Sequence, residues 1–117
     1  MMEETTIWHN AKCSKSRATL NLLEEKGLEP RIVPYLDDPP DADELKRVLG
    51  ILGFEPRALM RTREAPYDEL GLADVVDDEA LIRAMVENPI LIERPVVIRG
   101  DRAAIGRPPE NVLKVLE

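Results

Sequence analysis

The residue with the clearest chemical potential is Cys13, the only cysteine of the chain, in the stretch KCSKSR. The only histidine, His9, lies shortly before it. A thiol becomes a nucleophile when it loses its proton, and nearby cations or a helix N-terminus promote that loss. Lys12, Lys15 and Arg17 surround Cys13, although the chain as a whole carries a net charge of -7. We therefore interpret this segment as a cationic loop that holds a reactive thiolate.

Each of these residues also has a simpler explanation. A lone cysteine is more often a small buried apolar residue than a nucleophile, but the polar neighbours of Cys13 favour the reactive interpretation. His9 has three alternative roles: it orders the loop through a hydrogen bond, it stabilises the thiolate as a cation, or it ends the first strand. We favour the loop-ordering role. The hydroxyls of Ser14 and Ser16, with the free amides of a helix start, are further donors for a sulfur anion or a bound oxyanion.

One cysteine and one histidine limit the other chemistry that the chain can perform. A single cysteine excludes an internal disulfide and a metal cage built from cysteines, and His9 alone cannot form a metal site. We therefore expect no metal and no bound cofactor. Any redox reaction then requires a second thiol from another molecule.

The elements that must position this loop alternate between strands and helices. Pro34 predicts an edge position for the second strand, because a central strand would lose a ladder hydrogen bond there. Asp41, with Glu44 three residues later, resembles a capping box. The predicted elements are a strand at 5–8, a helix from 14 ending at Gly27, a strand at 31–36, a helix from 41 to 53, helical turns within 55–61 and 65–72, a helix capped by Asp77 or Asp78 and running to about 87, two strands around Gly100-Asp101, and a helix from Pro108-Pro109 to 116.

This order fits a thioredoxin-like α/β fold, a four-stranded mixed sheet flanked by helices with a helical insertion between the βαβ and ββα parts. The first two strands would be parallel, and the last two would form a hairpin. A residue in the loop after the first strand then lies at the carboxyl edge of the sheet. Cys13 would lie there, beside a helix N-terminus whose positive end favours the thiolate.

Composition restricts the other functional classes. The length of 117 residues predicts one domain, residues 1–117. The calculated pI of 4.8 argues against nucleic-acid binding, because no basic face is available to neutralise phosphates. No apolar run approaches the roughly 20 residues that span a bilayer, and the acidic N-terminus has no apolar signal region. We therefore expect a cytoplasmic protein that binds neither nucleic acid nor membrane.

Four motifs together resemble the glutaredoxin-dependent arsenate reductase (ArsC) family of thioredoxin-like proteins across nearly the whole chain. They are WHNAKCSKSRATL, RALMR, PILIERPVVI and IGRPPENVL, in that order. The C-S-K-S-R form of the loop resembles one branch of that family. The resemblance implies that Cys13 attacks arsenate or a similar oxyanion, that Arg94-Pro95 is a cis peptide bond, and that His9, Ser16 and Arg17 support the loop. It also implies that three arginines bind the oxyanion, namely Arg61, Arg94 and Arg107.

The resemblance further implies that glutathione is the thiol co-substrate and that glutaredoxin completes the reduction. Ser16 occupies the position where a C-x-x-C protein would have its second cysteine, so Cys13 cannot be resolved within the chain. Two alternatives remain. One is an Spx-type transcriptional regulator that binds RNA polymerase, against which Ser16 and Arg107 count. The other is a thiol oxidoreductase that acts on a different substrate.

Overall fold

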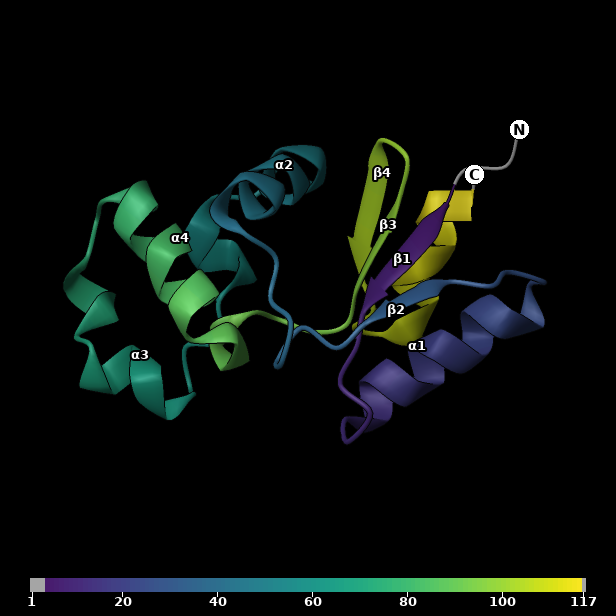
Figure 1. The fold of residues 1–117 in the computed structure, drawn as a ribbon, viewed down its shortest axis with the longest axis horizontal. Coiled ribbons are helices and arrows are strands. Elements are labelled where there is room, and N and C mark those ends of the chain that lie inside the picture. The colour runs from purple at the N-terminus through teal and green to yellow at the C-terminus, as the bar shows by residue number, and fades with distance from the viewer. Residues whose placement is uncertain (1–3, 117) are drawn as a thin grey trace. The chain divides into compact units, whose positions relative to one another are not determined.

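The computed structural model describes residues 4–116, and the chain divides into two compact units (Figure 1). The first unit combines the residues up to Asp38 with those from Arg94 onward, and it contains the sheet. The second unit, Pro39–Glu93, is built from helices and helical turns. That residues 1–117 form a single domain stays a prediction.

The sheet has four strands in the order β2-β1-β3-β4. Their bounds are β1 Thr5–Trp8, β2 Arg31–Val33, β3 Val96–Arg99 and β4 Arg102–Ile105. β1 pairs in parallel with β2 and antiparallel with β3, and β3 and β4 form an antiparallel hairpin. The predicted mixed sheet, its hairpin and the edge position of the second strand are thus confirmed.

The second strand is shorter than predicted. We expected it over 31–36, but β2 ends at Val33. Pro34 has no N–H to donate, and its carbonyl accepts hydrogen bonds from the backbone N–H groups of Asp37 and Asp38, both at 2.9 Å. The chain therefore turns directly after Val33.

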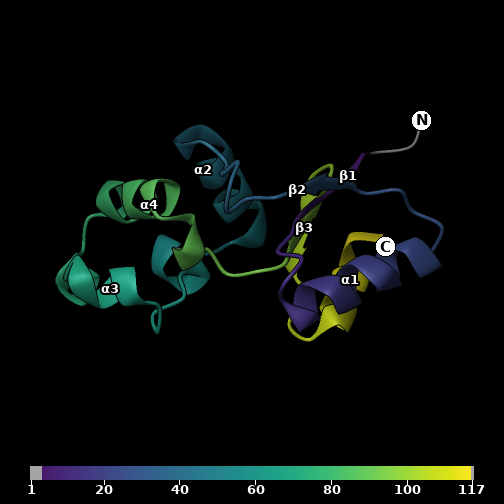
Figure 2. The same cartoon turned by 60° about the horizontal axis from the view of Figure 1, so that its bottom comes forward.

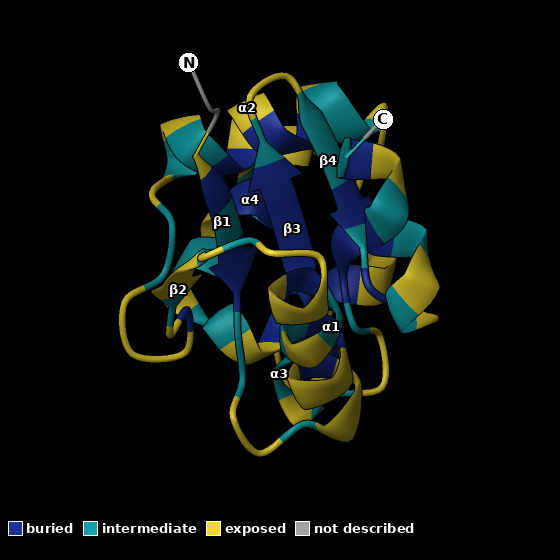
Figure 3. Cartoon of the chain, turned by 90° about the vertical axis from the view of Figure 1, so that its right-hand side faces the viewer, coloured by how far each residue is buried: buried dark blue, intermediate teal, exposed yellow. Residues whose placement is uncertain are grey.

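One face of the sheet packs against α1 (Ser14–Glu25) and the C-terminal 3₁₀ helix η4 (Pro109–Leu116). Figures 1 and 2 show α1 and η4 side by side on this face, and β3 is a largely buried strand in Figure 3. The predicted C-terminal helix is confirmed in position but has 3₁₀ geometry. The buried core between sheet and helices is formed by Ile7, Leu23, Val97, Ala104, Val112 and Val115.

The helical unit contains three α-helices, α2 (Ala42–Leu52), α3 (Ala65–Glu69) and α4 (Asp78–Glu87). The Asp41 side chain accepts a hydrogen bond from the backbone N–H of Glu44 at 2.8 Å, which confirms the predicted N-cap. Asp77 caps α4 in the same way through the N–H of Glu79 at 3.2 Å. Short 3₁₀ turns complete the unit at Pro56–Leu59 (η1), Leu72–Asp74 (η2) and Pro89–Leu91 (η3).

The side chain of Arg57 connects three short segments of the helical unit. The guanidinium of Arg57 donates to the Tyr67 hydroxyl and to the backbone carbonyls of Leu72 and Val75. Because η1, α3 and η2 are too short to be stable alone, these contacts of one guanidinium to α3 and to the segment around η2 stabilise their arrangement. Within residues 4–116, no helix combines the length and apolar character that crossing a membrane requires.

Candidate active site

Cys13 occupies the N-cap position of α1, at the end of a tight loop that follows β1. Its backbone N–H donates to the carbonyl of Asn10 at 2.9 Å, and the Asn10 side chain accepts from the N–H of Lys12 at 3.0 Å. The Arg17 guanidinium reaches back to the carbonyl of Ala11 at 2.8 Å. Arg17 therefore braces the loop. These contacts hold the thiol at the free amides of the first turn.

The surroundings of Cys13 favour its thiolate. Partial burial by itself raises the pKa of the Cys13 thiol, but hydrogen bonds from the backbone N–H groups of Ser16 and Lys15 and from the Arg94 side chain lower it. The net effect is a pKa below the ordinary value for cysteine. The Cys13 side chain makes no side-chain cap hydrogen bond, but it lies at the helix start, where a negative charge is stabilised.

His9 and Ser16 contact each other. The His9 Nδ1 and Ser16 Oγ atoms are 2.6 Å apart, and Ser16 Oγ also accepts from the backbone N–H of Asn10 at 3.1 Å. We expected the Ser16 hydroxyl to be available to the sulfur, but it faces the loop backbone, and the backbone N–H of Ser16 contacts Cys13 instead. Burial and the nearby Arg17 lower the pKa of His9. A neutral His9 fits the loop-ordering role better than the cationic one.

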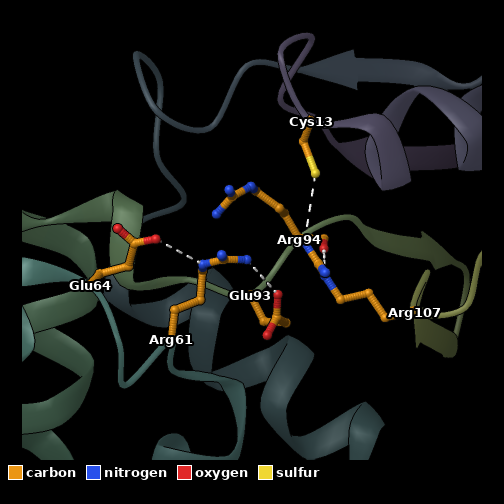
Figure 4. Close-up of polar contacts among 6 residues, drawn as sticks. All are labelled: Cys13, Arg61, Glu64, Glu93, Arg94 and Arg107. Atoms are coloured by element: carbon orange, nitrogen blue, oxygen red, sulfur yellow. Dashed lines mark hydrogen bonds and ion pairs between the residues drawn. The ribbon is translucent and has the colours of Figure 1, made fainter.

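Two of the three predicted arginines lie beside the sulfur (Figure 4). Arg107 Nη2 is 3.6 Å from Cys13 Sγ, while Arg107 Nε donates to the backbone carbonyl of Arg94 at 2.7 Å. The Arg94 side chain also forms a hydrogen bond with Cys13. Burial lowers the pKa of Arg94, but Tyr35 and Cys13 raise it, and the net shift is upward. Both guanidiniums present N–H groups around the thiol.

The segments that carry these arginines are brought together by the β3–β4 hairpin. Arg94 lies two residues before β3 and Arg107 lies two residues after β4, so strand pairing places them at the same edge of the sheet. The Arg94-Pro95 peptide bond is cis, as predicted, and Arg107-Pro108 is cis as well, which the sequence reasoning missed. The backbone N–H of Gly106 donates to the carbonyl of Pro95 at 2.9 Å and ties the two segments together.

The third predicted arginine, Arg61, belongs to the helical unit. Its guanidinium pairs with Glu64 at 3.3 Å and with Glu93 at 2.9 Å (Figure 4). The preceding residue, Met60, forms an isolated antiparallel β-bridge with Ile92. The backbone N–H of Arg61 donates to the carbonyl of Leu91 at 2.7 Å. Arg61 is thus held in place by two carboxylates, and its role toward an oxyanion stays a prediction.

The sequence reasoning also missed Tyr35, which it treated only as part of a strand. Tyr35 is fully buried, and its hydroxyl interacts with Arg94. Once Pro34 is taken as the end of the strand, Tyr35 falls in the loop after a strand parallel to β1, and that loop lies near the loop that follows β1. In residues 4–116, no three or more His, Cys, Asp or Glu side chains are grouped so that they could hold a metal ion.

The fold and the loop together define a thioredoxin-like protein with one activated cysteine at a helix N-terminus. The chain belongs to the ArsC family, whose family model matches residues 8–115. It is 53% identical over 118 residues to the uncharacterized protein YfgD of Escherichia coli K12, with 99% of both chains covered. It is 49% identical to an arsenate reductase of Neisseria meningitidis serogroup A, over 98% of this chain and all of the relative. The structure of an arsenate reductase from Vibrio cholerae superimposes with a TM-score of 0.94 at 49% identity, over 98% of this chain and 99% of that one.

Proposed function

We propose that this protein reduces arsenate to arsenite, with Cys13 as the nucleophile and with glutathione and glutaredoxin as the thiol donors. The observation that carries the proposal is the placement of Cys13 at the N-cap of α1, with Arg94 and Arg107 beside its sulfur. The likeness to proteins named arsenate reductase supports the choice of oxyanion.

In the proposed reaction, the Cys13 thiolate attacks arsenic and displaces one oxygen, which leaves as water after protonation. Arg94 and Arg107 donate hydrogen bonds to the remaining oxygens and offset the charge that the attack adds. Arg61 is proposed as a third donor. The loop amides of Lys15 and Ser16 stabilise the thiolate before the attack and release it as the bond to arsenic forms.

Two thiols must supply the two electrons that convert As(V) to As(III). Cys13 is one of them, and the chain has no second cysteine. Glutathione therefore adds at arsenic, the two sulfurs are oxidised to the level of one disulfide, and arsenite leaves. Glutaredoxin then reduces the mixed disulfide by thiol–disulfide exchange and returns the Cys13 thiolate.

The decisive experiment measures arsenite formation from arsenate by the purified protein with glutathione and glutaredoxin present. We expect multiple turnovers with the wild type and none with Cys13→Ser, whose hydroxyl is not ionised near neutral pH. Absence of turnover by the wild type would reject arsenate as the substrate. It would favour the two alternatives, a thiol oxidoreductase for another substrate or a regulator that binds RNA polymerase.

A further inference from the structure

Tyr35 is a buried tyrosine that the proposed reaction does not use. None of its surface is exposed, and its hydroxyl oxygen is shielded from solvent. Burying a hydroxyl is unfavourable unless a polar group contacts it, and phenylalanine would fill the same apolar space without that cost. The hydroxyl of Tyr35 therefore calls for an explanation beyond packing.

The topology brings Tyr35 to the edge of the sheet where the Cys13 loop lies. β1 and β2 are parallel, with Trp8 opposite Val33 at their carboxyl ends. The backbone N–H of His9, the first residue after β1, donates to the carbonyl of Val33 at 2.9 Å. The loops that follow the two strands therefore begin side by side, and Tyr35 lies in the second of them.

Arg94 connects the two loops. Its guanidinium interacts with the Tyr35 hydroxyl and with the Cys13 sulfur, and its Nε and Nη1 atoms are shielded from solvent. A guanidinium is planar and its donors diverge in fixed directions, so a partner on one side determines where the other N–H groups point. A phenol oxygen accepts such a bond without adding a competing negative charge at neutral pH.

We propose that Tyr35 is a positioning residue whose hydroxyl accepts a hydrogen bond from Arg94 and thereby directs the remaining guanidinium N–H groups toward Cys13 Sγ. The proposal rests on the nucleophilic role of Cys13 in the proposed function, but it does not require arsenate as the substrate. Without the hydroxyl, Arg94 keeps its charge and loses its fixed orientation, so it stabilises the thiolate less.

The test compares Tyr35→Phe with Tyr67→Phe by following the rate of Cys13 alkylation with iodoacetamide against pH. Tyr67 is a matched control, because its hydroxyl also contacts an arginine, Arg57, in the helical unit. We expect Tyr35→Phe to move the alkylation midpoint upward by about half a pH unit, the size of one weakened charge-assisted hydrogen bond. Tyr67→Phe should leave the midpoint unchanged.

The same comparison in an Arg94→Gln background shows whether Tyr35 acts through Arg94. We expect Tyr35→Phe to cause no further shift once the guanidinium has been removed. An unchanged midpoint in the single variant, or an equal shift in the Arg94→Gln background, would overturn the proposal. None of these measurements uses arsenate, so they test the role of Tyr35 even if arsenate proves not to be the substrate.

A second measurement needs no substitution at Tyr35 and thus does not depend on how well that variant folds. The chain has two tyrosines, so biosynthetic 3-fluorotyrosine gives two ¹⁹F resonances, which Tyr67→Phe assigns. We expect the chemical shift of the Tyr35 resonance to change with pH as Cys13 ionises, with the same midpoint as the alkylation rate. In Cys13→Ser the Tyr35 resonance should not change over this pH range. If both resonances move together, or neither does, Tyr35 is not coupled to the thiolate.

Discussion

The position of Cys13 at the N-cap of α1 favours its thiolate. The backbone N–H groups of Lys15 and Ser16 and the side chain of Arg94 outweigh the partial burial that opposes ionisation. Most of the stabilisation is thus supplied by groups that every helix start has, together with one arginine from the strand hairpin. The two lysines of the loop add a weaker field, because both side chains are exposed to solvent.

The first prediction concerns the pH dependence of this thiol. Because the pKa of Cys13 is lowered, the thiolate should persist below the ordinary cysteine pKa of about 8.5. Alkylation with iodoacetamide should accordingly reach half of its maximal rate below that pH and fall only as the pH drops through the lowered pKa. A midpoint at or above the ordinary value would show that the thiol is not activated.

At the scale of elements, the site depends on how closely the segment after β4 approaches α1 and Pro95. Gly106 lies at this contact, directly before Arg107. A Cβ at position 106 would overlap the Thr19 side chain and lie 2.7 Å from Cγ of Pro95. Thr19 itself is fixed, since it is buried and its hydroxyl donates to the carbonyl of Lys15 at 2.8 Å. Only glycine leaves room for this approach.

We therefore predict that Gly106→Ala destabilises the fold by about 1–3 kcal/mol through overpacking and lowers activity by displacing Arg107. Gly50→Ala is the matched control. Gly50 lies in α2, is exposed and has nothing within 4 Å of an added Cβ, so alanine should stabilise the helix by about 0.5–1 kcal/mol. Chemical denaturation with an activity assay measures both effects. Equal stability of the two variants would show that the close contact is unimportant.

At the scale of the whole molecule, charge is distributed unevenly. The net charge is -7, yet Lys12 and Lys15 flank Cys13 and, within residues 4–116, form no ion pair. Unpaired cations on an otherwise acidic protein attract a negatively charged thiol compound. Glutathione is such a compound, because it carries two carboxylates. The exposed loop is thus the face from which we expect the donor thiol to enter.

The corresponding prediction concerns the electron donor. We expect arsenate reduction to require glutathione plus glutaredoxin and to be slow with thioredoxin alone, because one cysteine cannot form the internal disulfide that thioredoxin would reduce. Arsenite formation with each donor system, at matched protein concentration, measures this. Equal turnover with thioredoxin in the absence of glutathione would contradict the mechanism.

Much of the fold could be predicted from the sequence, because its signals are local. The caps Asp41 and Asp77, the stop at Gly27 and the hairpin turn at Gly100 each depend on the conformational preferences of a few neighbouring residues. The thioredoxin-like order of strands and helices followed from these local patterns, and the reactive role of Cys13 stays a prediction. The end of β2 was misjudged, since apolar residues continue beyond Pro34 while backbone pairing does not.

The arrangement around the sulfur, by contrast, depends on tertiary structure. The motif resemblance predicted Arg94 and Arg107 as site residues. Both lie more than 80 residues after Cys13 in the sequence, and only strand pairing brings them to the Cys13 loop. The Ser16 hydroxyl turned toward His9, and Tyr35 became the neighbour of Arg94, through contacts that no local pattern encodes. Side-chain partners are chosen by the packing of distant segments. A sequence can therefore propose the reactive cysteine, while the groups around its sulfur are found only in the folded protein.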